Sequence, residues 1–200
     1  MADTAPRIGL TMRVVDAATY TEQRDAIAQD WPRFLKVALP GVPWLLIPNL
    51  GAEDAVRFCQ NWKINRLIVT GGDDIGISAR RDETETALLE WAARGKHPVL
   101  GICRGMQLMA ARAGMLCCQV EGHVATRHHV NGEIEREVNS YHSQALFNCP
   151  DGFVVTARAS DGTIEAMRHT SLPWSGWMWH PEREDAPKRC DIHELQKVLL

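Results

Sequence analysis

Short apolar runs alternate with longer amphipathic stretches along the first 115 residues, and this alternation constrains the fold most strongly. The apolar runs are typical of buried strands and the stretches between them of helices. Strands that alternate with helices predict right-handed βαβ units and a parallel sheet. The expected strands are 7–15, 44–48, 66–70 and 98–102; the expected helices are 20–38, interrupted near Pro32, 52–62, 81–95 and 106–113.

The C-terminal half has a different character. Residues 153–169 hold two strand-like runs around a turn at 160–163, which predicts a β-hairpin. We expect a further short strand within 175–184 and a closing helix over 191–200. The sequence has no repeat, low-complexity tract or linker, so we predict a single α/β domain over residues 1–200. Its central sheet should be mostly parallel, with an added β-hairpin region.

Cys103 occupies the point where the apolar run 98–102 meets a helix-like run that closes at Gly114. The first N–H groups of a helix have no internal partner, and the helix dipole places partial positive charge there. That setting favours a thiolate, which is the nucleophilic form of cysteine. Gly101 and Gly105 should allow a tight turn and the close approach of a substrate. A buried cysteine that acts as a small hydrophobe is the alternative that this segment leaves open.

A catalytic cysteine needs a base or a cationic partner, which in turn needs an orienting group. His180 and Glu182 stand two residues apart, so on extended backbone both side chains should project to one side. The apolar residues 177–179 would give them a dry setting. The alternative is a surface histidine at a strand end beside a solvated carboxylate.

The histidines at 123, 128 and 129 raise the question of a metal. They lie in a polar segment with no cysteine or carboxylate at a standard ligand spacing, so we expect no metal site. We also expect no cofactor.

Composition limits the classes of binding partner, and the cellular compartment, that we expect for this chain. The net charge of −3 argues against a nucleic-acid footprint and against a polybasic membrane patch. No apolar stretch approaches the length of a membrane span, and the segment MADTAPRIGL lacks the apolar core of a signal peptide. Six cysteines without a signal peptide indicate reduced thiols. We therefore expect a cytoplasmic protein whose partner is a small molecule.

Four blocks of the chain together resemble the class I glutamine amidotransferases and their free-standing relatives, the γ-glutamyl hydrolases of the C26 peptidase type. GICRGMQ (101–107) is similar to their nucleophile motif and VTGGDDIG (69–76) to their oxyanion strand. VNSYHSQAL (138–146) resembles the segment that helps to hold the glutamyl group, and MWHPERE (178–184) the His-Pro-Glu motif. The resemblance implies a flavodoxin-like three-layer sandwich.

The resemblance also implies roles for named residues. Cys103 would attack the γ-carbonyl and form a glutamyl thioester. His180 would protonate the leaving nitrogen and then activate water, and Glu182 would orient His180. The backbone N–H groups of Gly72 and Arg104 would form the oxyanion hole, in which each donor is typically worth about 3 kcal/mol. The residues implied around the glutamyl group are Gln107, Asn139, Ser140, Tyr141 and His142.

Two arrangements share this chemistry. A hydrolase releases the amine or amide of a γ-glutamyl conjugate to water, whereas an amidotransferase subunit passes ammonia to a separate synthase. The chain has no synthase domain, and its best block match is to the hydrolases, so we do not expect an obligate synthase partner. A non-catalytic binding module is a third hypothesis, against which the complete set of Cys103, His180 and Glu182 argues.

The segment 11–31 is similar to the opening of the family branch that hydrolyses γ-glutamyl-CDP-amidate in capsule phosphoramidate biosynthesis. This resemblance implies release of L-glutamate and cytidine diphosphoramidate; γ-glutamyl amines are the alternative substrates. Arginine suits a diphosphate because its planar fork binds oxygens in pairs. The double glycine lacks the flanking prolines common in the family, so the loop after Gly72 should shape a different leaving-group pocket. The candidate phosphate ligands are Arg13, which position favours, Arg24, Arg81 and Arg104; Tyr20 and Trp31 are the candidates for stacking on cytosine.

Overall fold

The computed structural model describes residues 5–200, so the first four residues of the segment examined for a signal peptide lie outside it. The helices are α1 (Asp30–Ala38), α2 (Ala52–Asn61), α3 (Ala79–Gly95), α4 (Arg104–Arg112) and α5 (Arg189–Leu199). The strands are β1 (Ile8–Thr11), β2 (Arg13–Asp16), β3 (Gln23–Ala26), β4 (Trp44–Ile47), β5 (Arg66–Val69), β6 (Val99–Ile102), β7 (Cys118–Gln119), β8 (Val124–Gly132), β9 (Arg136–Tyr141), β10 (Gln144–Ala145), β11 (Phe153–Ala159), β12 (Ile164–His169) and β13 (Trp174–Trp177).

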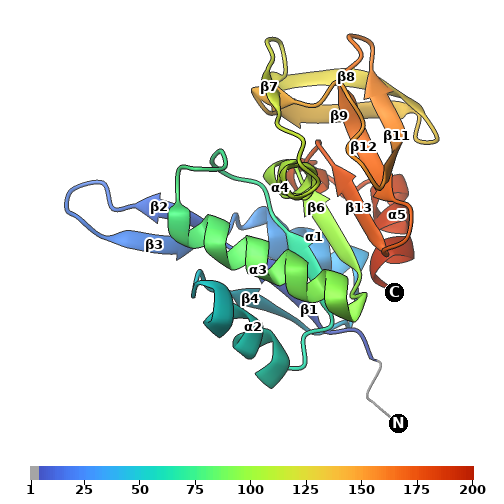
Figure 1. Ribbon diagram of the computed structural model, residues 1–200. Coiled ribbons are helices and arrows are strands. Elements are labelled where there is room, and N and C mark those ends of the chain that lie inside the picture. The colour runs from blue at the N-terminus through green and yellow to red at the C-terminus, as the bar shows by residue number, and fades with distance from the viewer. Residues whose placement is uncertain (1–4) are drawn as a thin grey trace.

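A nine-stranded sheet runs through the molecule in the order β4-β1-β5-β6-β13-β12-β11-β8-β9 (Figure 1). The first five strands in this order are parallel to one another and form the predicted βαβ core. From β13 onward each neighbouring pair is antiparallel, which extends the sheet well beyond the single hairpin that we predicted. The fold is the α/β class expected from the sequence.

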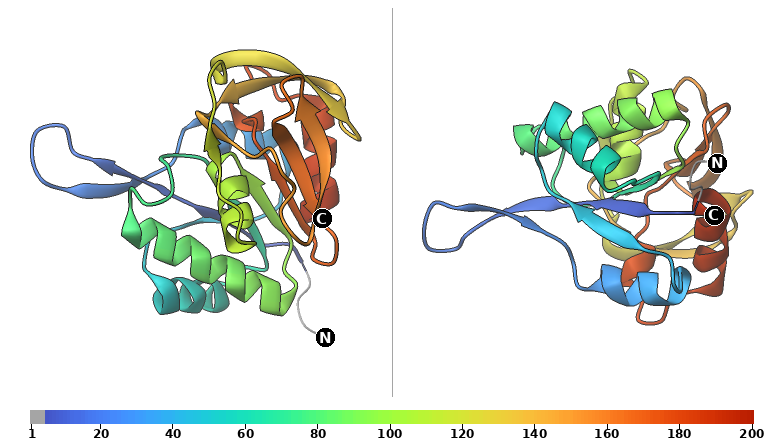
Figure 2. Two further views of the ribbon diagram at one scale, coloured as in Figure 1. Left: turned by 45° about the horizontal axis from the view of Figure 1, so that its top comes forward. Right: turned by 90° about the horizontal axis from the view of Figure 1, so that it is seen from below.

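Helices cover both faces of the parallel part, as the right-hand view of Figure 2 shows. Because side chains alternate along a strand, Leu67 and Val69 of β5 face α2, α3 and α4, whereas Ile68 faces α1 and α5. The result is two apolar cores separated by the sheet, and thus the three-layer sandwich. Within residues 5–200 no helix combines the length and apolarity that crossing a membrane requires.

The segment 20–29 departs from prediction. We expected it to be helical, but residues 23–26 form β3, which pairs with β2 in a separate two-stranded sheet. This hairpin projects from the rest of the molecule (Figures 1 and 2). The helix begins only at Asp30, with Pro32 in its first turn, where the missing N–H costs no hydrogen bond. Asp25 fixes the base of the hairpin by accepting hydrogen bonds from the backbone and side chain of Asn49 at 2.9 and 2.6 Å.

Candidate active site

Cys103 lies at the N-cap of α4, directly after β6, as the sequence predicts. Its backbone has φ 49° and ψ −104°, a conformation that costs a side-chain-bearing residue free energy. Its N–H donates to the Trp177 carbonyl oxygen at 2.7 Å, which ties the turn to β13. The thiol is therefore held at the start of a helix by a strained turn and is 5% exposed.

Gly101 and Gly105, two residues to either side of Cys103, allow close packing of the backbone. A Cβ on Gly105 would lie 2.1 Å from the Val69 carbonyl oxygen, and one on Gly101 would lie 2.7 Å from the Gly105 carbonyl carbon. We expected these glycines to admit a substrate. They instead allow the first turn of α4 to approach β5 and β6 closely enough to aim Cys103 at the carboxyl edge of the sheet.

His180 and Glu182 form a buried pair after β13. His180 Nδ1 lies 2.7 Å from Glu182 Oε1, and both side chains are 2% exposed. The prediction that both stand on extended backbone is wrong, because Pro181 begins a single 3-10 turn, Pro181–Arg183, with His180 as its N-cap. The turn brings the carboxylate back against the imidazole.

Gly71, at the end of β5, lies against both side chains. A Cβ on Gly71 would sit 2.6 Å from His180 Cε1 and 3.5 Å from Cys103 Cβ. The edge of the sheet therefore leaves no space for a side chain there. The double glycine in the sequence is the signal for this role, although we assigned a role to Gly72 alone.

The environment of His180 raises its pKa to about 9. Burial lowers the pKa, but the charge of Glu182 and hydrogen bonds to Cys103 and Glu182 raise it more. His180 is therefore an imidazolium at neutral pH, with Glu182 as its counter-ion. An imidazolium can both stabilise a neighbouring thiolate and donate a proton to a leaving nitrogen.

The segment 139–142 lies beside this pair, but three of its side chains form hydrogen bonds within the protein. Asn139 binds the backbone of His180, and Ser140 Oγ donates to the His123 carbonyl oxygen at 2.6 Å. His142 Nδ1 lies 3.1 Å from the Gln144 carbonyl oxygen. Tyr141 is half-exposed, and its ring meets the His180 ring edge to face at 5.8 Å. Contact of these residues with a glutamyl group stays a prediction.

Gln107 lines a hollow on the side of α4. Its side-chain Nε2 donates to the Gln144 carbonyl oxygen at 3.1 Å, and Gln144 in turn donates to Asp74 at 2.7 Å. The hollow has a volume of about 220 Å³ and is also lined by Ile75 and Met115. These contacts link the loop after Gly72 to the segment 139–145.

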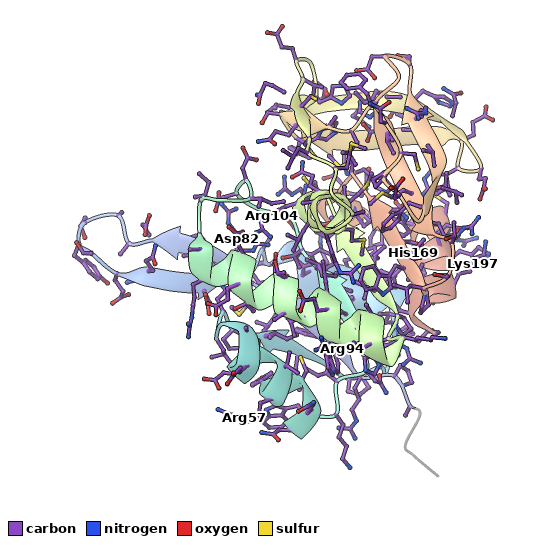
Figure 3. The ribbon with its side chains drawn as sticks, viewed as in Figure 1. Arg57, Asp82, Arg94, Arg104, His169 and Lys197 are labelled. Carbon is purple, nitrogen blue, oxygen red and sulfur yellow. The ribbon has the colours of Figure 1, made fainter. Side chains whose placement is uncertain are left out.

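Arg104 follows Cys103 directly and Gly72 follows Gly71, but an oxyanion hole formed by their N–H groups stays a prediction; the Arg104 side chain is buried. Gly72 has φ 145°, and Arg104 is the first residue of α4. The guanidinium of Arg104 pairs with Glu85 and Asp82 of α3, toward which it extends in Figure 3. Arg104 is therefore not free to bind a phosphate, and the prediction that it is a phosphate ligand is wrong.

Arg81 is also withdrawn from solvent, at 2% exposure. Its Nε donates to Glu85 at 2.9 Å, and its Nη2 donates to the carbonyl oxygens of Thr70 and Gly71 at 2.9 and 3.0 Å. Arg81 thus holds the backbone of the double glycine instead of facing a ligand. No local sequence pattern separates this buried arginine from an exposed one.

Arg13 lies at the base of the projecting hairpin, next to the loop that follows β5. A Cβ on Gly72 would lie 3.3 Å from Arg13 Cβ, and Arg13 Nη2 pairs with Asp73 at 3.1 Å. Arg13 lines a small pocket with His180 and Arg183, and also a groove of about 370 Å³ between the hairpin and the loop at 73–78. Arg183, whose guanidinium carbon lies 4.6 Å from the Tyr141 ring centroid, is a cation that our sequence reasoning missed.

The two aromatic candidates lie in different settings. Trp31 is 2% exposed and packs edge to face on Phe34, but it also borders the small pocket beside His180, so its stacking on cytosine stays a prediction. Tyr20 is exposed at the tip of the hairpin, where Arg24 donates to its hydroxyl and also pairs with Glu22. Only Arg13, of the four arginines proposed as phosphate ligands, borders the hollow beside His180.

Comparison with known proteins fits this architecture. The family Glutamine amidotransferase class-I matches residues 47–197. The chain is 31% identical to the γ-glutamyl-CDP-amidate hydrolase of Campylobacter jejuni, over 92% of this chain and 94% of that protein. It is 29% identical to one subunit of the glutamine-hydrolysing GMP synthase of Methanocaldococcus jannaschii, over 71% of this chain and 76% of that one.

A solved structure gives the same fold. The crystal structure of a putative GMP synthase subunit from Thermoplasma acidophilum superposes with a TM-score of 0.71 at 18% identity, covering 98% of this chain and 92% of that one. The family match over residues 47–197, the relative similar along nearly the whole chain and the shared fold lead to one conclusion: the chain belongs to the class I glutamine amidotransferase family.

Proposed function

We propose that the chain is a cysteine hydrolase that cleaves a γ-glutamyl amide bond through a glutamyl thioester. The observation that carries the proposal is the convergence on Gly71 of Cys103, at a strained helix start, and His180, paired with Glu182. A cysteine, an imidazole and an orienting carboxylate in this order are the parts that nucleophilic acyl transfer needs.

The reaction has two steps. The Cys103 thiolate adds to the γ-carbonyl carbon, and the amide nitrogen leaves with a proton from the His180 imidazolium. The neutral His180 then takes a proton from water, which attacks the thioester carbonyl and releases glutamate and the thiol. In both steps the N–H groups of Gly72 and Arg104 stabilise the negative oxygen.

The substrate that we propose is γ-glutamyl-CDP-amidate, with L-glutamate and cytidine diphosphoramidate as products. The similarity to the Campylobacter jejuni enzyme, which covers 92% of this chain and 94% of that protein, supports this substrate. The groove of about 370 Å³ between hairpin and loop 73–78 lies next to Gly72, with Arg13 at its border. In this proposal Arg13 binds the diphosphate of the leaving group.

The test uses the purified chain with γ-glutamyl-CDP-amidate, glutamine and a γ-glutamyl polyamine in parallel, with products followed by mass spectrometry. We expect the highest kcat/KM on the nucleotide conjugate and a transient mass increase of one glutamyl group on Cys103. Faster hydrolysis of the polyamine derivative would reject the nucleotide substrate. No acyl adduct and no product from any of the three would reject the hydrolase.

A second candidate is a glutaminase subunit that delivers ammonia to a synthase, which the similarity to the Methanocaldococcus jannaschii GMP synthase subunit favours. A chain of this kind is expected to hydrolyse glutamine only when its synthase is added. Titration of the chain with the synthase component of a GMP synthase, with glutaminase activity as readout, separates the two functions.

A further inference from the structure

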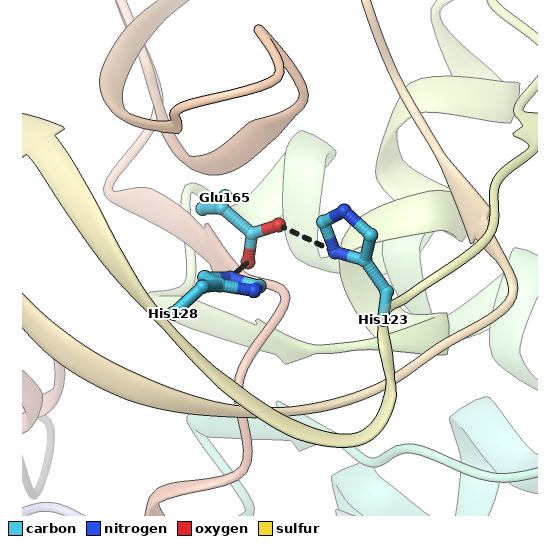
Figure 4. A group of neighbouring side chains, drawn as sticks. All are labelled: His123, His128 and Glu165. Atoms are coloured by element: carbon cyan, nitrogen blue, oxygen red, sulfur yellow. Dashed lines mark ion pairs between the residues drawn. The ribbon is translucent and has the colours of Figure 1, made fainter.

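Three side chains outside the active site converge in the antiparallel part of the molecule. His123 precedes β8, His128 lies on β8 and Glu165 lies on β12 (Figure 4). His123 Nδ1 lies 3.6 Å from Glu165 Oε1, and His128 Nε2 lies 3.4 Å from Oε2. One ligand atom from each of the three lies within 4.8 Å of the others. We expected no metal because no cysteine or carboxylate stands at a standard ligand spacing from these histidines; β12 brings Glu165 to them in space.

A fourth group lies on the same carboxylate. His142 Nε2 is 3.4 Å from Glu165 Oε1, and the rings of His123 and His142 are 4.7 Å apart. Glu165 and His142 are buried, as is His123. By contrast His129, the next residue on β8, is exposed and lies 3.8 Å from Glu135.

The positions of the protons make this cluster unusual. His123 Nε2 lies 2.8 Å from Asp161 Oδ2, a carboxylate that accepts a proton donor, so the ring nitrogen that faces Glu165 carries a lone pair in the neutral imidazole. His142 Nδ1 lies 3.1 Å from the Gln144 carbonyl oxygen, which leaves a lone pair on its Nε2 in the same way. In the neutral form of both rings, two acceptor nitrogens face the Glu165 carboxylate, which is itself only an acceptor.

Most of the atoms that face one another in this cluster lack a hydrogen-bond partner in the described part of the chain. Within residues 5–200, four buried atoms of the cluster have no hydrogen-bond partner: His123 Nδ1, His128 Nε2, His142 Nε2 and Glu165 Oε2. Buried acceptors without a partner are costly, so a positive charge between them would be strongly favoured.

We propose that His123, His128 and Glu165 bind a divalent transition-metal ion of the zinc type, with His142 nearest to the fourth coordination position. Imidazole nitrogens and a carboxylate are suitable zinc ligands, and bonds of about 2.0–2.1 Å set neighbouring ligand atoms about 3.3 Å apart in a tetrahedral site. The separations of 3.4 and 3.6 Å between histidine nitrogens and Glu165 oxygens are close to that value. The longest separation, 4.8 Å, needs a rotation of one side chain on binding.

The surroundings match those of known metal-binding histidines. Such a histidine usually donates its second ring N–H to a carboxylate or a carbonyl oxygen, which fixes the nitrogen that binds the metal. Asp161 does this for His123, and the Gln144 carbonyl does it for His142.

A bound ion would stabilise the segments that carry His123, His142 and Glu165, which lie beside the active site. The His123 carbonyl accepts from Ser140 Oγ and from the His142 N–H, and the Glu165 carbonyl accepts from the Met178 N–H at 2.8 Å. Met178 is two residues before His180. The site is therefore structural, and its loss should affect stability before it affects the chemistry at Cys103.

The experiment measures metal binding alone. Chain freed of metal by chelation is titrated calorimetrically with Zn²⁺, and bound metal per chain is then counted by mass spectrometry after desalting. We expect one ion per chain and a higher midpoint of thermal unfolding. His123→Ala and Glu165→Gln should abolish binding, and Asp161→Asn, a partly exposed position less prone to disturb folding, should weaken it by about tenfold or more.

His129→Ala, one residue from His128 on the same strand, is the matched control and should bind as the unaltered chain does. Co²⁺ identifies the ligands, because bound cysteine gives an intense near-ultraviolet thiolate band that a nitrogen and oxygen site lacks. No Zn²⁺ bound by the unaltered chain, a thiolate band, or equal affinities for Asp161→Asn and His129→Ala would each overturn the proposal. None of these readouts depends on the hydrolase activity, so the two proposals fail separately.

Discussion

Asn139 holds His180 by its backbone from both sides. The Asn139 Nδ2 donates to the His180 carbonyl oxygen at 2.8 Å, and the Asn139 Oδ1 accepts from the His180 N–H at 2.9 Å. Asn139 of β9 thus fixes the backbone that carries the imidazole, and Tyr141 of the same strand meets the imidazole ring edge to face. In our proposal Asn139 is a positioning residue, and its Nδ2 also donates to Glu184 Oε1 at 3.0 Å.

Asn139→Ala should lower kcat with little change in KM. It leaves the buried N–H of His180 unpaired and removes one of the two donors to the His180 carbonyl oxygen, which keeps the Arg183 N–H; the expected cost is about 2 kcal/mol in the free energy of unfolding. Steady-state kinetics and urea unfolding measure the two effects. Asn131→Ala, at an exposed position of β8, is the control. An unchanged kcat in a folded Asn139→Ala chain would contradict the positioning role.

Cys103→Ala should abolish turnover in a chain that still folds, because no other residue would replace the thiolate. The φ of 49° adds a second expectation: Cys103→Gly should be more stable than Cys103→Ala by about 1 kcal/mol, since glycine adopts this conformation without strain. Product assays and paired denaturation curves test both statements. Activity above a few per cent of the original in Cys103→Ala would remove Cys103 from the mechanism.

The pKa of about 9 for His180 predicts an alkaline limit to activity. In the proposed mechanism the imidazolium is the acid for the leaving nitrogen, so kcat/KM should fall as the pH rises through about 9. The same raised pKa stabilises the fold fully below the unfolded value of about 6.5, and this contribution is lost as the pH rises through about 9.

Glu182→Gln should move that alkaline limit to lower pH, because the charge of Glu182 is a main cause of the raised pKa. Its loss of activity should be smaller than that of Cys103→Ala, as nucleophile and base both remain. The pH profile of kcat/KM for Glu182→Gln measures this shift. A profile identical to that of the unaltered enzyme would show that Glu182 does not tune His180.

Arg13→Ala should raise KM about tenfold or more for γ-glutamyl-CDP-amidate and much less for a simple γ-glutamyl amide, since only the former has a diphosphate to bind. Arg24→Ala is the control, because Arg24 pairs with Glu22 and Tyr20 away from the groove. Equal losses on the two substrates would refute the role of Arg13 in recognising the leaving group.

The parallel core was predictable because its strands are short runs of mostly apolar residues: residues 66–69 and 99–102 fall within the predicted limits. Gln23–Ala26 was not, since this polar strand exists only through its pairing with β2. The hairpin of β8 and β9 was missed for a similar reason. Its side chains are largely polar and exposed, and its place is set by pairing with β11.

The residues of the candidate site also fall into two groups, those that the local sequence predicts and those that it does not. Cys103, His180 and Glu182 are recognisable from short motifs, because chain neighbours determine where they lie. The burial of Arg81 and the encounter of Glu165 with His123 depend on contacts between distant elements, which no local pattern records.

The hairpin of β2 and β3 forms a sheet of its own, joined to the body at its base, where Asp25 binds Asn49. A two-stranded unit that adds no strand to the central sheet is open to replacement without repacking either core. Residues 14–24 can therefore be exchanged while Arg13 and Asp25 stay in place. If the proposed function holds, hairpins of other lengths and charges in this segment would offer a route to altered leaving-group preference without changes to the residues around His180.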